Sequence, residues 1–273
     1  MKNKTFLFFA AVMFLFTVDS CQHHYPVSLV EADSLVYSNP KAALQKLDSL
    51  SLCLDTTQKA DVMYLRLLKM TVKDKLYMPF GTLDSVQSLA KYYEEEGDKH
   101  LLPRAYYMLG RMFVESEDVP SALAAYRKVL AQLEQHEDIR LRGITNAQLG
   151  EMFGRQEILS LALSFYKEAF LCDSLLADEV GMLYDMRDMG TSFDYLGMKD
   201  SANVCFRKAL TKAREVKDDD MEHELLLHLA NSYLDVNADS VAKYMFLVND
   251  FELLDRCEEG CIKGAYLQMI GRD

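Results

Sequence analysis

Hydrophobic residues follow two different patterns along the chain. Near the N-terminus, residues 6–18 (FLFFAAVMFLFTV) form one apolar run without a charge. Beyond it, apolar and charged residues intermingle in segments dominated by Leu, Ala, Lys, Glu, Met and Tyr, which favour helix over strand. Half of the 273 residues are hydrophobic, and there are only 5 Pro and 12 Gly. The sequence therefore predicts an all-α protein with a core of its own.

Three helices are predicted before residue 100. The stretch Ser38-Asn39-Pro40 is expected to cap a helix over Lys41–Leu50, with the proline in its first turn. Two more helices are expected over Ala60–Lys75 and Leu83–Glu96, and a Gly-Asp pair ends the second. Together they predict one partial and one full repeat unit, which form an N-terminal cap over residues 28–100.

Downstream, four segments superpose at a spacing of 40 residues, which indicates an internal repeat. The segments begin near Pro103, Gly143, Leu183 and His223. Each has a pair that ends in a small residue: Leu109-Gly110, Leu149-Gly150, Met189-Gly190 and Leu229-Ala230. An aromatic residue follows three positions later: Phe113, Phe153, Phe193 and Tyr233. An alanine and then another aromatic residue complete the pattern: Ala122 and Tyr126, Ala162 and Tyr166, Ala202 and Phe206, Ala242 and Phe246.

This pattern is typical of two antiparallel helices joined by a tight turn, such as Glu115–Asp118 or Leu196–Asp200. The small residue of each pair lets the two helices approach closely, and the alanine of the second helix does the same from the other side. The two aromatic residues fill the space between the helices and cover the next unit. One unit cannot bury its apolar face alone, so the units are expected to stack. Four units are predicted over residues 101–255, followed by a partial helix over 256–273.

The pattern resembles the tetratricopeptide repeat (TPR), which is marked by an aromatic residue, Leu-Gly, Tyr, Ala, Phe and Ala at fixed offsets. The first segment matches it at Tyr106, Leu109, Gly110, Phe113, Ala122 and Tyr126. Later segments lose the first aromatic residue, which Asn146, Met186 and Leu226 replace. The resemblance covers about residues 28–270 and implies a TPR-like α-solenoid of antiparallel helix pairs. Because the period exceeds the usual ~34 residues, each helix is expected to be longer by most of a turn.

Three stretches, EADSLVYSNPKAALQKLDSL, KYYEEEGD and AYYMLGRMF, are similar to TPR lipoproteins and membrane-bound TPR regulators of Gram-negative bacteria. Longer members of that family carry a transmembrane helix, a coiled coil and a helix-turn-helix domain after the repeats. Here the sequence ends soon after Tyr266 and Met269, which look like the first helix of another unit. Either the chain is a short member with a stub cap, or its C-terminal half has been lost.

The N-terminus reads as a targeting segment. Lys2 and Lys4 precede the apolar run, whose thirteen residues would span about 20 Å as a helix, less than the ~30 Å of a bilayer core. A secretory signal peptide over residues 1–20 is therefore expected. The stretch Val18-Asp19-Ser20-Cys21 resembles a bacterial lipobox, although Asp19 stands where a small or apolar residue is usual. The resemblance implies acylation of Cys21, with residues 21–27 as a tether. An uncleaved anchor and soluble secretion are the alternatives.

Charge and motifs narrow the function. The formal net charge of −12 argues against nucleic-acid binding, which needs clustered Lys and Arg. An acidic surface suits a basic partner, but it also simply keeps a protein soluble. The sequence contains no nucleophile elbow, zinc-protease motif, P-loop or dinucleotide fingerprint. No catalytic site, cofactor or small-molecule substrate is predicted.

Histidines and cysteines do not suggest a metal site. His23 and His24 are adjacent but lack further ligands, and the other histidines are isolated: His100, His136, His223 and His228. Cys257 and Cys261 are four residues apart and could form a redox or metal pair, yet only two ligands are visible. Cys172 and Cys205 are expected to be small core residues.

In a TPR array the first helix of each unit lines a groove that commonly holds a partner peptide or helix. The residues predicted to face it are Tyr107, Arg111, Glu115, Glu151, Arg155, Arg187, Thr191, Asp194, Tyr195, Asn231 and Asp235. Such mixed polarity is equally typical of any solvated helix face. Groove residues that clamp a C-terminal carboxylate are paired Asn and Lys, and only Asn231 matches, so carboxylate capture is not predicted.

These observations predict a non-enzymatic scaffold or sensor of the bacterial cell envelope. It would bind a protein or peptide partner in the groove and contact the membrane only through its lipid anchor, on the periplasmic or outer-membrane side. The family resemblance suggests a signalling role. An accessory lipoprotein of an outer-membrane assembly or glycan-uptake complex is the alternative.

Overall fold

The computed structural model describes residues 23–234 and 237–248, together with residues 264 and 271. These residues form α-helices, turns and short connections, and they contain no β-strand. The predicted all-α class is confirmed. By their contacts, the helices fall into two compact units, one ending at Met112 and one beginning at Phe113.

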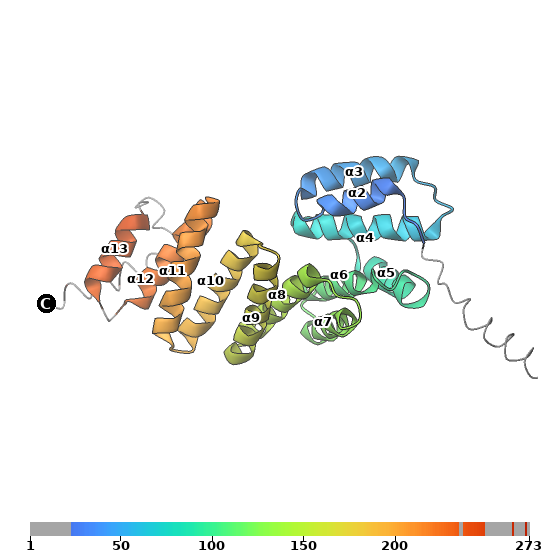
Figure 1. Ribbon diagram of the computed structural model, residues 1–273. Helices are drawn as coiled ribbons and strands as arrows, with labels where there is room; N and C mark the ends of the chain where they lie inside the picture. Colours follow the sequence, from blue (N-terminus) through green and yellow to red (C-terminus); the bar gives the residue numbers. More distant parts are fainter. Residues whose placement is uncertain (1–22, 235–236, 249–263, 265–270, 272–273) are drawn as a thin grey trace, which may run out of the picture. The chain divides into compact units, whose positions relative to one another are not determined.

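The described part of the first unit begins with four helices, which Figure 1 labels. They are α2 (Val27–Leu35), α3 (Pro40–Cys53), α4 (Lys59–Lys75) and α5 (Leu83–Glu95). Most of α6 (Leu102–Glu115) also belongs to this unit. The three helices predicted before residue 100 are confirmed as α3, α4 and α5, whereas α2 was not predicted.

Local sequence explains where these helices begin. Asn39 is the N-cap of α3, and its side chain accepts a hydrogen bond from the backbone N–H of Ala42 at 3.1 Å. Thr82 and Ser85 form a capping box at the start of α5. Helices α2, α3 and α4 pack on one another around buried aliphatic residues such as Leu29 and Leu47.

The described residues of the second unit include seven complete helices, and from α8 onward each packs on the helix before it. They are α7 (Val119–Leu133), α8 (Ile139–Arg155), α9 (Leu159–Leu175), α10 (Glu179–Tyr195), α11 (Lys199–Val216), α12 (Asp219–Ser232) and α13 (Ala238–Val248). Helices α8, α9 and α10 each have 17 residues, so one pair with its turns fills the 40-residue period. The predicted TPR-like α-solenoid of helix pairs is confirmed.

The period is also visible in the helix caps. Asp138, Asp178 and Asp218 are the N-caps of α8, α10 and α12, and each accepts a hydrogen bond from the backbone N–H three residues later. These bonds measure 2.9–3.0 Å. The same side chain therefore starts the first helix of three successive units.

The turns inside the units repeat as well. Glu117, Glu157 and Gly197 have positive φ angles of 57°, 59° and 75° and end the first helix of their units in the left-handed conformation. In each turn, the carbonyl of the repeated phenylalanine accepts a hydrogen bond from the N–H five residues later, at 2.9–3.0 Å. The acceptors are Phe113, Phe153 and Phe193. The repeated spacing thus fixes backbone geometry in addition to side-chain packing.

Close approach of the paired helices depends on glycine. A Cβ atom added at Gly150 of α8 would lie 2.6 Å from the ring of Tyr166 on α9. A Cβ atom added at Gly190 of α10 would lie equally close to the ring of Phe206 on α11. The expected roles of the small residue and the aromatic residue are confirmed at both places.

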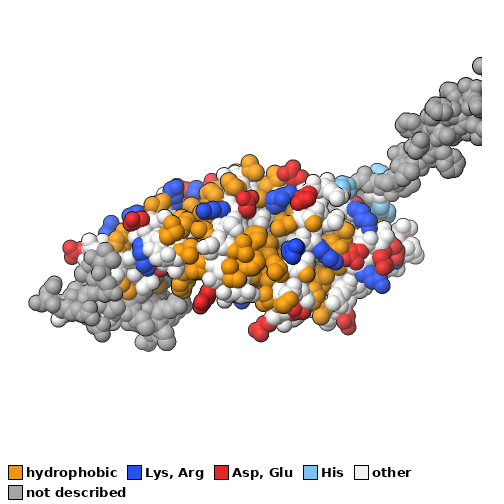
Figure 2. Space-filling model, turned by 90° about the horizontal axis from the view of Figure 1, so that it is seen from below, with side chains coloured by type: hydrophobic (Ala, Val, Ile, Leu, Met, Phe, Trp, Pro, Cys, Tyr) orange, Lys and Arg blue, Asp and Glu red, His pale blue; other side chains and the backbone are white. Residues whose placement is uncertain are grey.

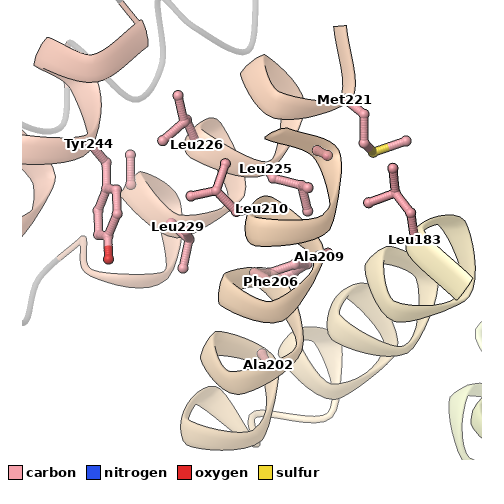
Figure 3. Packing of buried hydrophobic residues seen from close by; sticks show 12 residues of the cluster. Leu183, Ala202, Phe206, Ala209, Leu210, Met221, Leu225, Leu226, Leu229 and Tyr244 are labelled. Atoms are coloured by element: carbon pink, nitrogen blue, oxygen red, sulfur yellow. The ribbon is translucent and has the colours of Figure 1, made fainter. Parts of the chain in front are cut away.

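Phe206 lies in a buried cluster formed by residues of α10, α11, α12 and α13 (Figure 3). Leu183 of α10 and Leu225 and Leu229 of α12 are fully buried in the same cluster. The second-helix alanine, Ala202, is also fully buried, as the repeat pattern predicts.

The last described helix departs from the pattern. The repeat predicts that Ala242 and Phe246 pack inward, but Phe246 is 72% exposed, and the buried residues of α13 are Val241 and Tyr244. Helix α13 begins 39 residues after α11 instead of 40. Because one residue rotates a helix by about 100°, this shift turns a different face inward. The expectation for Phe246 is therefore wrong, and Ala242 is half-buried.

Several predictions concern other parts of the chain. The signal peptide (1–20), the lipidation site Cys21, Asp235, and the cysteines Cys257 and Cys261 lie outside the described residues. In the part of the chain that the structure does describe, no helix combines the length and apolar character needed to cross a membrane.

Replacement of Gly150 by alanine tests the close approach of α8 and α9. The added methyl group would overlap the buried ring of Tyr166, so we expect Gly150→Ala to lower the free energy of unfolding by roughly 1–2 kcal/mol. Chemical denaturation measures it. Gly154→Ala is the control in the same helix, since its nearest neighbour would be 3.6 Å away and alanine favours helix. Equal stability of both variants would contradict the packing role.

Candidate partner-binding site

A cavity of about 250 Å³ opens in the second unit between α8, α9 and α10. Its residues come from the C-terminal halves of the two first helices, α8 and α10, and from the start and middle of α9. They are Glu151, Gly154, Arg155, Leu159, Tyr166, Asp188, Thr191, Ser192 and Tyr195. The site therefore spans two successive repeat units.

The apolar part of the cavity consists of aromatic and aliphatic side chains. Tyr166 is 7% exposed and packs beneath Gly150, while Gly154 leaves room near its hydroxyl. Leu159 is half-buried at the start of α9. Tyr195, in contrast, is 75% exposed, so most of its ring has no packing partner in the unit. An exposed tyrosine at the edge of a cavity is typical of interaction surfaces.

The charged part contains two carboxylates. Glu151 pairs with Arg155 of the same helix at 2.5 Å, and both side chains are largely exposed. Asp188 is three-quarters buried and pairs with Arg187 at 2.7 Å. Arg187 also reaches Glu224 of α12 at 3.2 Å. This arginine therefore divides its charge between acids of two neighbouring repeat units.

Acid–base properties reflect this environment. Burial raises the pKa of Asp188, Arg187 opposes the effect, and the charges of Glu151 and Glu224 add to it. Burial also raises the pKa of Tyr166, and the nearby Asp188 and Glu151 raise it further. The environment of the cavity therefore disfavours the ionised forms of both Asp188 and Tyr166.

Four of the eleven residues predicted to face a partner line this cavity: Glu151, Arg155, Thr191 and Tyr195. Two others lie on the same helix α10 but bind within the protein. Arg187 pairs with Asp188 and Glu224, and Asp194 pairs with Lys199 at 2.6 Å. The structure therefore brings together the predicted residues of two units.

The remaining predicted residues lie elsewhere. In the first unit, Tyr107 is 8% exposed, and Arg111 pairs with Asp74 of α4 at 2.8 Å, so both offer little surface to a partner. Glu115 and Asn231 are exposed. Arg111 is a poor position for a binding variant, because its replacement would leave the mostly buried Asp74 without this partner.

Sequence reasoning missed the residues that the second helix contributes. Leu159 and Tyr166 belong to α9, and the sequence pattern assigned Tyr166 to packing alone. Asp188 and Ser192 also line the cavity and were not predicted. Their spacing gives the signal, because residues 188, 191, 192 and 195 follow the three- and four-residue steps of one helix face.

Other reactive side chains form no comparable site. Among the described residues there is no group of three or more His, Cys, Asp or Glu side chains placed to hold a metal ion. Cys172 is buried as expected, Cys205 is half-buried, and burial raises the pKa of both thiols.

A pair of carboxyl groups lies between α9 and α10. Asp185 is 3% exposed and hydrogen-bonds with Asp173, while its Oδ2 has no hydrogen-bond partner among the described residues. Burial and the charge of Asp173 raise the pKa of Asp185 far above its usual range. Gly181 makes room for the pair, since a Cβ atom there would overlap Asp173. A raised pKa favours the protonated form of Asp185, which can donate the hydrogen bond to Asp173 across the two helices.

The residues after the predicted lipidation site pack on the first unit. His23 hydrogen-bonds with Asp61 of α4 at 2.6 Å, and the ring of Tyr25 lies 4.3 Å from that of Tyr64. The hydroxyl of Tyr64 donates to Asp33 at 2.7 Å. Residues 23–25, which belong to the predicted tether, are therefore docked.

No model of a known protein family and no curated protein matches the sequence. Several solved structures, however, match the fold of this chain. The apo form of RapI has a TM-score of 0.71 and 12% identity, with 90% of this chain and 70% of RapI covered. A Rap protein complexed with Competence and Sporulation Factor has a TM-score of 0.62 and 14% identity, with 81% and 63% covered. BtubC (BKLC) from P. vanneervenii has a TM-score of 0.54 and 16% identity, with 89% of each chain covered. The chain shares their fold.

Replacement of Asp185 tests the carboxyl pair. In the folded protein Asp185 keeps its proton, whereas in the unfolded chain it loses the proton above about pH 4. The free energy of unfolding therefore falls as pH rises from about 4 toward the raised pKa of Asp185 in the folded state. In Asp185→Asn the side-chain amide can donate a hydrogen bond to Asp173 at any pH, so the folded protein does not need to bind an additional proton. We expect it to be more stable at pH 8 by roughly 1–3 kcal/mol, with a smaller difference at pH 4.

Chemical denaturation at a series of pH values gives the result. Asp200→Asn, at an exposed acid in the first turn of α11, is the control. A stability difference that does not change with pH would show that the pair carries no additional proton.

A second test concerns the docking of residues 23–25. Asp61→Ala removes the partner of His23, so the backbone amides of this segment should exchange hydrogen at least tenfold faster. Hydrogen exchange read by mass spectrometry measures this, with Asp84→Ala, at an exposed acid of α5, as the control. Unchanged exchange would mean that the aromatic contacts alone hold the segment.

Proposed function

We propose that this chain is a non-enzymatic binding scaffold that holds a protein or peptide partner in the cavity between α8, α9 and α10. One observation carries the proposal. Four residues chosen from the repeat pattern as groove-facing, which lie on two different helices, line a single cavity. In this cavity the exposed ring of Tyr195 lies with Asp188 and Ser192, polar residues that are mostly buried.

The fold is consistent with this proposal. A Rap protein of the same fold has been solved in complex with Competence and Sporulation Factor. At 14% identity the likeness concerns the fold alone, so for this chain it supports binding as a class of function and identifies no partner.

We further propose that the chain is exported and attached to the cell envelope through Cys21, as a scaffold or sensor. The lipobox-like sequence supports attachment. The docking of His23 on α4 adds a constraint, because two extended residues reach at most about 7 Å. An anchor at Cys21 would therefore hold the first unit directly at the membrane surface.

Crosslinked pull-down from intact cells tests the binding role. In Glu151→Lys/Tyr195→Ala the replaced side chains are 44% and 75% exposed, so stability should change little. We expect at least tenfold lower recovery of a partner that the wild type captures. Glu168→Lys/Tyr77→Ala makes the same substitutions at exposed positions outside the cavity and should retain it. Equal recovery with both variants would exclude the cavity as the partner site.

Cys21→Ala is the second arm of the same experiment. If Cys21 carries the lipid, this variant should leave the membrane fraction while the purified protein still captures the partner. Continued membrane association of Cys21→Ala would favour the uncleaved anchor.

A further inference from the structure

We propose that the cavity between α8, α9 and α10 receives a lysine or arginine side chain of the partner and thereby selects a basic segment. This inference rests on the proposed function, since it assumes that the cavity is the partner site. It adds the chemistry of recognition, which the repeat pattern alone does not give.

The charges that line the cavity are unequal. Glu151 and Asp188 enter it from two different helices. Arg155 is the cation among the lining residues, and its side chain is 73% exposed, so it extends largely into solvent. Arg187 pairs with Asp188 from outside the lining and is shared with Glu224. Arg155 pairs with Glu151, so the lining holds two carboxylates and one guanidinium, while Asp188 shares Arg187 with Glu224. The lining therefore has one more negative than positive side chain.

The neighbouring groups respond to this imbalance. The pKa of Asp188 is raised mainly by burial, and the adjacent guanidinium of Arg187 does not bring it back to its usual value. Glu151 contributes to the raised pKa of both Asp188 and Tyr166. A cation placed between Glu151 and Asp188 would relieve the repulsion that both groups experience.

The shape of the cavity also suits one long basic side chain. Its volume of about 250 Å³ is below the ~300–1,000 Å³ typical of sites that enclose a whole small molecule. Leu159 and the rings of Tyr166 and Tyr195 offer an apolar surface to the methylene groups of lysine or arginine. The face of an exposed tyrosine ring additionally attracts a cation.

Acidic ligands are disfavoured by the same groups. A carboxylate in the cavity would face Glu151 and the partly buried Asp188, and it would compete with Glu151 for Arg155, the cation of the lining. The net charge of −12 adds a long-range preference for basic partners. Apolar residues flank the cavity at the two turns, where Ile158, Leu196 and Met198 are exposed. A segment with a basic residue next to apolar ones would therefore contact both surfaces.

A position-scanning hexapeptide library tests the inference on the full-length protein. Peptides acetylated at the N-terminus and amidated at the C-terminus carry no terminal charge, so that only side chains are compared. We expect at least a tenfold preference for Lys or Arg over the uncharged norleucine at one position, and this preference should weaken as salt is raised.

Charge reversal identifies the site. Glu151→Lys changes a 44% exposed side chain and should convert the preference at that position to Asp or Glu. Asp188→Asn should reduce the basic preference at least fivefold without reversing it. Glu168→Lys, which reverses an exposed acid of α9 outside the cavity lining, should leave the preference as in the wild type.

The outcomes separate the two proposals. Peptides that bind and compete with the partner, but without a basic preference sensitive to Glu151, would overturn the inference and leave the proposed function standing. A wild-type protein that binds no peptide in the library would contradict peptide binding at the cavity and the basic preference together.

Discussion

The structure depends on one contact, the close approach of a glycine backbone to an aromatic ring in the pairs α8–α9 and α10–α11. Gly150 lies against Tyr166 and Gly190 against Phe206, and any side chain at either glycine would overlap the ring. This contact sets the distance between paired helices, while the aspartate caps and left-handed turns set where each helix begins and ends. Because all these features repeat every 40 residues, corresponding residues of successive units lie on the same face. Where the spacing changes by one residue, at α13, Phe246 is exposed instead.

The same constraint creates the candidate site. The hydroxyl end of Tyr166, whose ring supports Gly150, lies next to Gly154, and residues of α8 and α10 complete the cavity around it. Packing and recognition thus use opposite ends of one side chain. Exposed apolar side chains also occur elsewhere on the surface (Figure 2), but the cavity combines them with partly buried charge. An apolar surface provides affinity, whereas charged side chains fixed by ion pairs provide the discrimination between partners.

The repeat made most of the fold predictable from sequence, because the spacing of its glycines, alanines and aromatic residues matches two packed antiparallel helices per unit. The same pattern indicated which helix faces the groove, and four of its residues line the cavity. Pairwise charge contacts were not predictable. Arg111 and Arg187 looked available for a partner, yet acids on other helices bind them, Asp74 and Glu224. Such contacts depend on side-chain positions 37 residues apart in the sequence, which periodicity alone does not pair.

Site-specific photocrosslinking in living cells tests the central claim, that the repeat register builds a partner site at this cavity. A benzophenone amino acid placed at Tyr195 would lie at the cavity edge, and the same group placed at Glu168 would lie on an exposed position of α9 outside the lining. The account predicts a discrete crosslinked partner from the first position and none of that size from the second. Crosslinks from Glu168 with none from Tyr195 would contradict it and place the partner on the surface formed by the second helices.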